Sequence, residues 1–217
     1  MHNKTANMKK LIAIMLLALP MAAIAQNVWE KPKEDVVEKK AEKEKKPNKD
    51  EKYLRGAVPV VDGQVQWTLD VDVPGKSAQE IYDKMLQTLT DLTKSEGQLE
   101  GSGVTLVNKQ DHIIVANVRE WLLFTANFIS LDRTKFHYTL IANCTDGHLN
   151  MTMGRISYRY DEERLKQVYK AEEWITDEYA VNKKNTKLYP VSAKFRRKTI
   201  DRKDQIFETI RNVLLKD

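Results

Sequence analysis

The segment from Gln64 to Val73 alternates apolar and polar residues more regularly than any other part of this chain. Its apolar members are Val65, Trp67, Leu69, Val71 and Val73. Successive side chains of a strand point to opposite faces of a sheet, so the pattern predicts a strand with one buried face and one solvated face. The dipeptide Pro74-Gly75 ends this strand.

A helix is predicted directly after it. Ser77 and Glu80 have the spacing of a capping box, in which a hydroxyl and a carboxylate satisfy free backbone N–H groups. The helix is expected to run to about Glu96 and to stop at Gly97. One face of it is apolar and comprises Ala78, Ile81, Tyr82, Met85, Leu89 and Leu92.

Four further strands are predicted. They are Val104–Lys109, His112–Ala126, Thr134–Thr145 and Leu149–Tyr160. The second is apolar on both parities around Trp121–Phe124, so both of its faces need cover. The face away from the main helices is expected to be covered by the last helix or by another subunit. Asp146-Gly147 is a two-residue hairpin turn. In the last strand the apolar parity changes at Gly154, which predicts a β-bulge near Gly154–Arg155. Gly154 is expected to take the positive φ that a bulge often needs.

The chain is predicted to end in two helices. The first opens at Asp161 or Glu162, and the second begins at about Lys194, after a polar loop that contains Pro190. The second carries an apolar stripe of Ile206, Phe207, Ile210, Val213 and Leu214. The order β-α-β-β-β-β-α plus a C-terminal helix predicts an α+β domain, with a five-stranded antiparallel sheet and helices packed mainly on one face.

The first 25 residues have the pattern of a cleavable secretory signal. Lys9-Lys10 precedes the apolar run Leu11–Leu19, and Ala23-Ile24-Ala25 supplies small residues before a predicted cleavage after Ala25. A membrane anchor is the alternative, but the run Leu11–Ala25 is shorter than the roughly 20 residues that span a bilayer. We therefore expect a periplasmic or secreted protein that begins at Gln26 and has no transmembrane segment after processing.

Residues 26–57 are predicted to be a charged, disordered tether, and residues 58–217 to be the folded domain. Between Glu30 and Arg55 there are 10 basic and 8 acidic residues with almost no apolar periodicity. Such a segment cannot bury enough surface to offset the entropy lost on ordering. A frayed, solvated helix between Pro32 and Pro47 stays open as an alternative.

The net charge of +5 does not indicate a nucleic-acid partner. Lys4, Lys9 and Lys10 lie in the predicted leader, which has no acidic residue, so the 36 basic side chains fall to 33 against 31 acidic ones. The resulting field is too weak to attract a polyanion to the whole chain.

Few residues of the types used in catalysis or metal binding occur in this chain, and no catalytic, cofactor-binding or metal-binding residue is predicted. His112, His137 and His148 lack other ligands at metal-binding spacing, although His137 and His148 flank the hairpin turn and could approach across it. Cys144 belongs to an apolar, alternating strand and is expected to be a buried core residue. No disulfide is possible within the chain, because Cys144 is its single cysteine.

Three other features have ordinary structural interpretations. Asp70 and Asp72 are interpreted as a solvated sheet face rather than a glycosidase-like pair, and Gly101-Ser102-Gly103 as a flexible turn rather than a nucleophile elbow. A basic cluster opens the last helix: Lys194, Arg196, Arg197, Lys198, Arg202 and Lys203. We interpret it as a solvated helix face that pairs with acidic residues between 161 and 178. Contact with an anionic surface, or with nucleic acid, is the alternative.

Two stretches carry a family resemblance. They are AEEWITDEYAVNKKNTKLYPVSAKFRRKTID, Ala171–Asp201, and the opening VDGQVQWTLDVDVPGKSAQEIYDKML. With the leader, they resemble a family of exported proteins described only as a domain of unknown function with a TBP-like (TATA-binding-protein-like) fold. The resemblance covers about Val60 to Leu215. It implies the fold, gives no residue a role and does not imply DNA contact, because function belongs to sites rather than to folds.

The expected function is that of an exported cell-envelope binding or accessory module without an evident catalytic site and without a cofactor. Its partner would be an envelope protein or ligand, and a homodimer stays open. The alternative is a periplasmic hydrolase with an unrecognised site. A hydrolase requires ionisable groups from different strands to meet in one cleft, whereas a binding module requires an exposed apolar patch or groove.

Overall fold

A computed structural model describes residues 48–126, 131–160 and 167–216, which belong to one compact unit, Lys45–Asp217. The predicted signal and most of the predicted tether lie outside these residues. The elements are a 3-10 turn Glu51–Tyr53, β1 Val60–Val61, β2 Gln64–Val65, β3 Trp67–Asp72, α1 Ala78–Lys94, β4 Gly103–Asn108, β5 Ile113–Ala126, β6 Leu131–Thr145, β7 His148–Arg159, β8 Val168–Lys170, a 3-10 turn Ala171–Glu173, α2 Asp177–Ala180 and α3 Pro190–Leu215.

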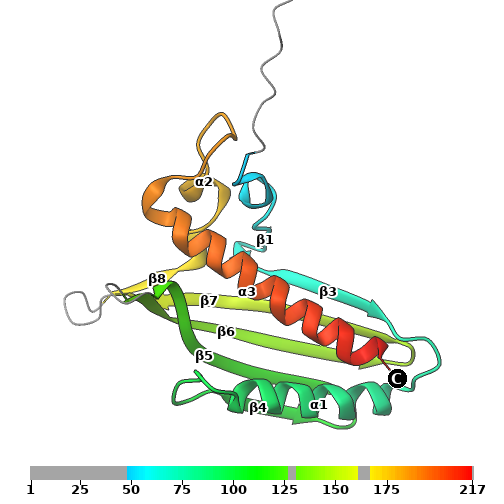
Figure 1. Ribbon diagram of the computed structural model, residues 1–217. Helices are drawn as coiled ribbons and strands as arrows, with labels where there is room; N and C mark the ends of the chain where they lie inside the picture. The colour runs from blue at the N-terminus through cyan, green and yellow to red at the C-terminus, as the bar shows by residue number, and fades with distance from the viewer. Residues whose placement is uncertain (1–47, 127–130, 161–166, 217) are drawn as a thin grey trace, which may run out of the picture. The chain divides into compact units, whose positions relative to one another are not determined.

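The larger sheet has six antiparallel strands rather than the five predicted. Its order is β3-β7-β6-β5-β4, and the short β8 pairs with the end of β7. Figure 1 shows α1 and α3 over the same face of this sheet, and the described residues place no helix on the opposite face. The predicted α+β class, with helices on one face, is therefore confirmed. No helix in the described part of the chain is both long and apolar enough to cross a membrane.

The core lies between the sheet and the two long helices. Every second residue of the central strands is buried there, including Ile114, Ala116, Val118, Phe136, Tyr138, Leu140, Leu149, Met151 and Met153. The capping box that starts α1 is present: the Ser77 hydroxyl accepts a hydrogen bond of 3.3 Å from the Glu80 backbone N–H, and the Glu80 carboxylate accepts one of 2.8 Å from the Ser77 backbone N–H. Cys144 is buried as predicted.

The predicted bulge in β7 is confirmed, but its backbone differs from the expectation. Thr139 pairs with Gly154 whereas His137 pairs with Ser157, so β7 has one extra residue between these pairs. The residue with a left-handed backbone is Arg155, at φ 52, and not Gly154. The extra residue restores the core parity, because Met153 and Ile156 are both buried.

The helix predicted from Asp161 is wrong for the part that is described. Residues 161–166 lie outside the described chain, and Val168–Lys170 form β8, which pairs with Ser157–Arg159. The helix propensity of three residues is a weak preference. The open edge of β7 supplies backbone hydrogen-bond partners, and these outweigh that preference. The last helix also begins earlier than predicted, at Pro190, because proline is well suited to the first helical position.

On its helical face, the strand with apolar residues on both faces is covered by α3. Phe124 packs against Phe195 of α3 with ring centroids 4.6 Å apart, and Leu122 is buried. On the opposite face the guanidinium of Arg133 lies 3.8 Å from the centroid of the Trp121 ring. Leu123 is 46% exposed. The last helix is therefore the cover for one face only.

The folded unit begins earlier than the predicted boundary at residue 58. Residues 48–57 pack against α3, where Arg197 forms hydrogen bonds of 2.7 and 2.9 Å with the Asp50 carboxylate. The hydroxyl of Tyr53 donates a hydrogen bond of 2.9 Å to the Asp201 carboxylate. The composition of this segment suggested disorder, but its charged residues meet opposite charges on α3.

Candidate functional site

A groove separates α1 from α3 on the helical face of the sheet. One part of it has a volume of about 420 Å³ and is lined by Thr88, Asp91, Leu92, Ser95, Arg202, Ile206, Thr209, Ile210 and Val213. The ammonium of Lys84 donates a hydrogen bond of 3.0 Å to the Lys216 carbonyl and joins the two helices at the C-terminal end of α3. The apolar part of its wall is formed by Leu92 of α1 and by Ile206, Ile210 and Val213 of α3.

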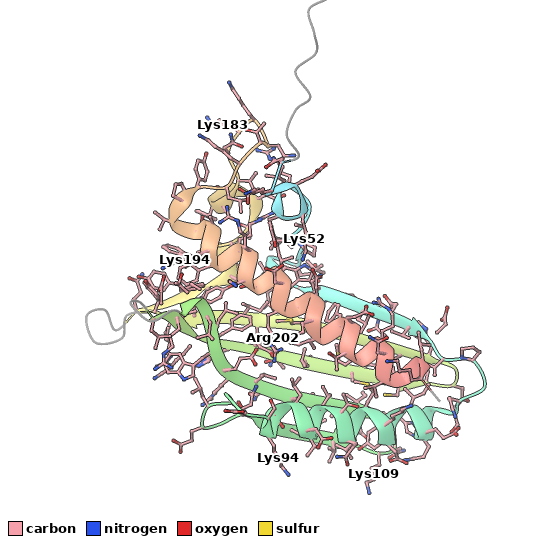
Figure 2. The ribbon with its side chains drawn as sticks, viewed as in Figure 1. Lys52, Lys94, Lys109, Lys183, Lys194 and Arg202 are labelled. Atoms are coloured by element: carbon pink, nitrogen blue, oxygen red, sulfur yellow. The ribbon has the colours of Figure 1, made fainter. Side chains whose placement is uncertain are left out.

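A second hollow of about 560 Å³ adjoins the first and shares Arg202 with it. Its lining comprises Glu96, Gly97, Glu120, Trp121, Leu122, Leu123, Arg133, Lys198, Asp201, Arg202 and Gln205. Figure 2 shows Arg202 between α3 and the strands beneath it. The groove thus joins an apolar part between the helices to a charged part beside β5.

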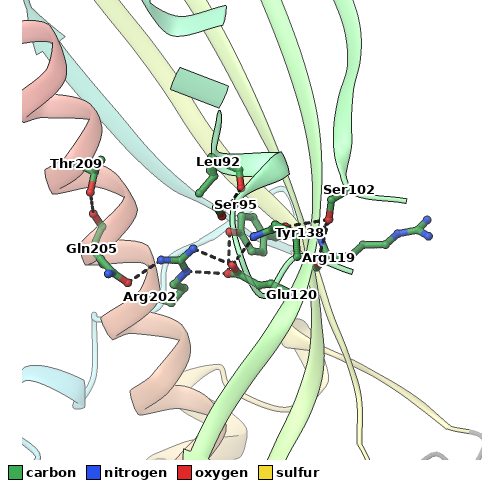
Figure 3. A network of polar contacts seen from close by, with 10 residues as sticks. Leu92, Ser95, Ser102, Arg119, Glu120, Tyr138, Arg202, Gln205 and Thr209 are labelled. Atoms are coloured by element: carbon green, nitrogen blue, oxygen red, sulfur yellow. Dashed lines mark hydrogen bonds and ion pairs between the residues drawn. The ribbon is translucent and has the colours of Figure 1, made fainter. Parts of the chain in front are cut away.

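Glu120 of β5 and Arg202 of α3 form an ion pair where the two parts meet (Figure 3). Arg202 donates from Nε to Oε1 and from Nη2 to Oε2, each over 2.8 Å. The Tyr138 hydroxyl donates to Oε1 over 3.0 Å, and Gln98 donates to Oε2 over 2.9 Å. Arg202 also donates to the side-chain oxygen of Gln205 over 2.7 Å.

This network leaves little capacity for acid–base chemistry. Glu120 is only 6% exposed and accepts four hydrogen bonds, about as many as a carboxylate can accept. Burial, and then the neighbouring Glu120 charge, raise the pKa of Tyr138 well above its ordinary value, so its hydroxyl stays a donor. A carboxylate held in this way is a structural partner for Arg202 rather than a general base.

A second polar cluster lies on the helix-free face. His148 of β7 lies between two aspartates of β3, with Nδ1 2.9 Å from Asp72 Oδ1 and Nε2 3.4 Å from Asp70 Oδ1. The amide of Asn150 donates to Asp70 over 2.7 Å. The hydrogen bond to Asp72, and after it the one to Asp70, raise the pKa of His148. The side chain of Asp72 is 91% exposed, so this is an open surface cluster and not a cleft.

The other candidate residues are not brought together. His137 pairs with Ser157 and His148 with Thr145, so the two histidines that flank the turn are far apart along the hairpin. Burial raises the pKa of the Cys144 thiol to about 12, which makes it unreactive at neutral pH. In the described residues, no group of three or more histidine, cysteine or acidic side chains could hold a metal ion.

The Ser102 hydroxyl and the basic cluster of α3 have structural partners. Ser102 Oγ accepts a hydrogen bond of 2.8 Å from the backbone N–H of Arg119 and so clamps the loop onto β5. Most of the basic side chains of α3 are paired with carboxylates: Lys194 with Asp132, Arg196 with Asp177, Arg197 with Asp50, Arg202 with Glu120 and Lys203 with Asp204. Only Asp177 belongs to the acidic stretch predicted to be their partner.

The sequence analysis named Arg202 as part of a solvated helix face and missed Glu120, its partner at the centre of the groove. One signal was available: Glu120 occupies a core position of its strand, since Val118 and Leu122 on the same parity are buried. A charged residue at a core position predicts a buried ionic partner. The identity of that partner, 82 residues later in the chain, follows from the packing of α3 and not from any local pattern.

Comparison with known proteins identifies relatives but no activity. Residues 67–159 match the family described as "Domain of unknown function (DUF4468) with TBP-like fold". No curated protein is significantly similar to the chain.

Two solved structures resemble this one. A TBP-like protein from Parabacteroides distasonis ATCC 8503 is 21% identical, with a TM-score of 0.60 over 73% of this chain and 97% of that chain, and it supports the fold alone. A DUF4468 family protein from Bacteroides ovatus ATCC 8483 is 37% identical, with a TM-score of 0.71 over 76% of this chain and 94% of that chain. At this identity and coverage, the chain belongs to the DUF4468 family, a family of unknown function with a TBP-like fold.

Proposed function

We propose that this protein is an exported, non-catalytic binding module of the cell envelope that holds an amphiphilic ligand in the groove between α1 and α3. The groove itself is the observation that carries the proposal. Its volume of about 420 Å³ lies within the roughly 300–1,000 Å³ that small-molecule sites occupy. Such sites have apolar walls with a few polar groups at fixed positions, as this groove has.

The distribution of side chains defines the ligand's two parts. The apolar part would lie against Leu92, Ile206 and Ile210, between the two helices. The polar part would lie in the adjoining hollow. Two carboxylates of this hollow are paired with cations, Glu120 with Arg202 and Asp201 with Lys52, and Lys198 contributes a positive charge. Lys198 is exposed and can reorient toward a ligand, whereas Arg202 is held in place by Glu120. We therefore favour a ligand with an anionic head group.

The hydrolase alternative receives no support from this groove. A hydrolytic site needs a base that can accept a proton, and the Glu120 carboxylate already accepts four hydrogen bonds. The exposed Asp70, Asp72 and His148 cluster has ionisable groups from two strands, but it lies on an open surface that does not exclude water. A binding role needs neither a base that can accept a proton nor a site that excludes water.

A fluorescent amphiphile tests the groove. The probe is 1-anilinonaphthalene-8-sulfonate, which combines apolar rings with an anionic group, and the protein is residues 26–217. Thr209→Trp places a large side chain in the groove lining, and Arg211→Trp places the same side chain on an exposed position of α3 outside that lining. We expect Thr209→Trp to weaken probe binding at least about tenfold, a difference of about 1.4 kcal/mol, and Arg211→Trp to bind as the wild type does.

Thermal unfolding of both variants distinguishes a blocked groove from an unfolded protein, because partly folded states also bind this probe. If two variants with native unfolding curves bind the probe equally well, the groove is not the site and the proposal is wrong.

Export is part of the proposal and has a separate test. The support for it is the order of Lys9-Lys10, the apolar run Leu11–Leu19 and the small residues at Ala23 and Ala25. Intact-mass analysis of the envelope fraction should give a chain that begins at Gln26. A replacement of Ala25 by Arg should leave the leader attached. Recovery of the full-length wild-type chain from the cytoplasm would contradict export.

A further inference from the structure

The outer edge of β5 changes its surroundings after Glu120. Along a strand, the backbone N–H and C=O groups of successive residues point to alternate edges. Arg119 directs both groups away from β6, because its N–H donates to Ser102 Oγ over 2.8 Å and its carbonyl accepts from the Leu99 N–H over 2.7 Å. The register of β5 with β6 stays regular as far as Leu123. Trp121 and Leu123 therefore direct their backbone groups toward the same outer edge.

No strand of the described chain pairs with this part of the edge. The first residue of β4 lies opposite Asn117, and the last pairing along the edge is the isolated bridge between Gln98 and Glu120. Figure 1 shows β5 continuing past the end of β4. Within the described residues, the outward backbone groups of Trp121 and Leu123 thus lack a backbone partner. An open edge of this kind is a template for another strand.

The hollow of about 560 Å³ lies along this open edge. Its lining includes four consecutive residues of β5, from Glu120 to Leu123, although successive side chains of a strand project to opposite faces. A hollow that reaches all four lies at the edge of the strand. Its other walls are Glu96 and Gly97, after the end of α1, and residues of α3. The open edge therefore faces a bounded space that suits a short extended chain.

Positive charge is in slight excess in this hollow. The guanidinium of Arg133 is stacked on the Trp121 ring, 3.8 Å from its centroid, and a stacked guanidinium keeps its charge and its hydrogen-bond donors. In the part of the chain that the structure describes, neither Arg133 nor Lys198 forms an ion pair, and among the acids of the lining only Glu96 is likewise unpaired there. Two cations against one acid favour an occupant that carries a carboxylate.

We propose that the polar part of the ligand is a short extended peptide that pairs with the open edge of β5, so that the ligand is an acylated peptide with a free carboxylate. An extended backbone matches the alternating N–H and C=O groups of a strand edge. The acyl chain would lie between α1 and α3, in the apolar part of the groove, which adjoins this hollow at Arg202. The inference rests on the proposed function, because it assigns the chemistry of the ligand that the groove holds.

Two substitutions of Leu123 separate the contribution of the backbone from that of the side chain. Leu123→Pro removes the N–H that faces the open edge, and an edge strand tolerates proline in that orientation. Leu123→Ala keeps this N–H and loses the same apolar side chain, which is 46% exposed. Thermal unfolding identifies any variant that does not fold.

The probe is N-decanoyl-Val-Thr-Glu, titrated calorimetrically into residues 26–217, and decanoate is the matched ligand without a peptide. We expect the acyl peptide to bind the wild type at least about tenfold more tightly than decanoate does, since each backbone hydrogen bond adds a modest net contribution. Leu123→Pro should abolish this difference, and Leu123→Ala should keep most of it.

Amide hydrogen exchange of the wild type measures the pairing directly. In the free protein the amide protons of Trp121 and Leu123 should exchange quickly, because they face the open edge. The amide of Leu122 points toward β6, where Thr134 lies opposite it, and should be protected throughout. The acyl peptide should slow exchange at Trp121 and Leu123, and decanoate should not.

The inference is overturned if folded Leu123→Pro and Leu123→Ala bind the acyl peptide equally well, or if the peptide leaves the exchange of Trp121 and Leu123 unchanged. Protection of these two amides by a higher protein concentration alone would show that a second copy occupies the edge, and this result also overturns the inference. Failure of the groove is recognised separately, by sulfonate-probe binding that Thr209→Trp does not weaken, because Leu123 does not line the apolar part between the helices.

Discussion

Arg202 of α3 holds Glu120 of β5 through two parallel hydrogen bonds of 2.8 Å each. The side chain of Glu120 is 9% exposed and that of Arg202 is 23% exposed, so the pair is largely removed from water. It fixes the distance between the last helix and the sheet beside the groove. A buried ion pair of this kind adds little net stability, because desolvation offsets most of the attraction.

Removal of one partner should therefore be costly. Glu120→Ala leaves the Arg202 guanidinium, the Tyr138 hydroxyl and the Gln98 amide without their acceptor. We expect the free energy of unfolding to fall by about 3–5 kcal/mol, measured by urea denaturation. The value should lie toward the lower end, since Arg202 can reach some solvent.

The double variant Glu120→Leu with Arg202→Met is the matched control. It replaces both charges by apolar groups of similar size and leaves the Tyr138 hydroxyl and the Gln98 amide without this acceptor. It should therefore be less stable than the wild type but more stable than Glu120→Ala. A single variant that is as stable as this double variant would show that the pair is already hydrated in the native protein.

The bulge in β7 gives a second prediction, at Arg155. A left-handed backbone costs a residue with a side chain about 1–2 kcal/mol, and most for a β-branched one. Arg155, at φ 52, already bears most of this cost. Arg155→Val should therefore lower the unfolding free energy only by the additional penalty of β-branching, less than about 1–2 kcal/mol, whereas Arg155→Gly should leave it unchanged or raise it.

Gly154→Ala is the control for this prediction. Gly154 does not have a positive φ, and an added Cβ would be 3.6 Å from the Val65 carbonyl oxygen, an ordinary contact. The change should therefore alter stability little. If Gly154→Ala were more damaging than Arg155→Val in thermal unfolding, the strained position would be the glycine, as the sequence pattern suggested.

The difference between Gly154 and Arg155 illustrates what a sequence can predict about this fold. The change of apolar parity from Met153 to Ile156 is a local signal, and it predicts one extra residue. The alternation of β3 and the capping box of α1 are local in the same sense. Which residue of the bulge takes the left-handed backbone depends on the pairing with Thr139 and His137 of β6, so the pattern in β7 alone cannot assign it.

The errors occurred where distant segments decide the structure. Val168–Lys170 is a strand only because the end of β7 offers it backbone partners. Asp50 and Tyr53 are ordered only because α3 provides Arg197 and Asp201. The groove between α1 and α3 is likewise a product of helix packing. Two boundaries do have local signals: Pro190 begins α3, and Asp62-Gly63 forms the turn between β1 and β2.

The His148 cluster makes stability depend on pH. Asp72 and Asp70 raise the pKa of His148 in the folded protein, so protonated His148 is stabilised relative to the unfolded chain, where its pKa is about 6.5. This contribution is fully present below about pH 6.5 and is lost as the pH rises through the folded pKa. The effect should be small because the cluster is exposed.

NMR titration of the His148 ring measures this directly. Asp72→Asn should lower the His148 pKa toward its ordinary value, and Asp70→Asn should lower it less, in the order of the two interactions. Asp62→Asn, which removes an acid from the β1–β2 turn, serves as the control and should leave the titration unchanged. A His148 pKa that does not respond to Asp72→Asn would mean that the hydrogen bond between them does not form in solution.

The hydrogen bonds of Arg196 predict where the stable domain begins. Its side chain is fully buried, and its guanidinium donates four hydrogen bonds of 2.6 Å, to the carbonyls of Tyr53, Leu54 and Ile175 and to the carboxylate of Asp177. Burial lowers the pKa of this guanidinium, which reflects the cost of holding a charge there. Two of the four acceptors belong to the segment that composition assigned to a disordered tether.

Two truncations separate the tether from the domain. A chain that begins at Asn48 keeps every partner of Arg196 and should unfold as the chain from Gln26 does. A chain that begins at Val58 loses the carbonyls of Tyr53 and Leu54, and also the Ala57 carbonyl that accepts from the Trp67 indole over 2.9 Å. A buried charge deprived of its partners costs about 3–5 kcal/mol, so this second chain should unfold at a clearly lower urea concentration.

Adding Arg196→Met to it should recover part of the loss, because an apolar side chain needs no acceptor. If the chain from Val58 were as stable as the chain from Asn48, residues 48–57 would contribute nothing to the fold in solution, and the domain would begin at residue 58.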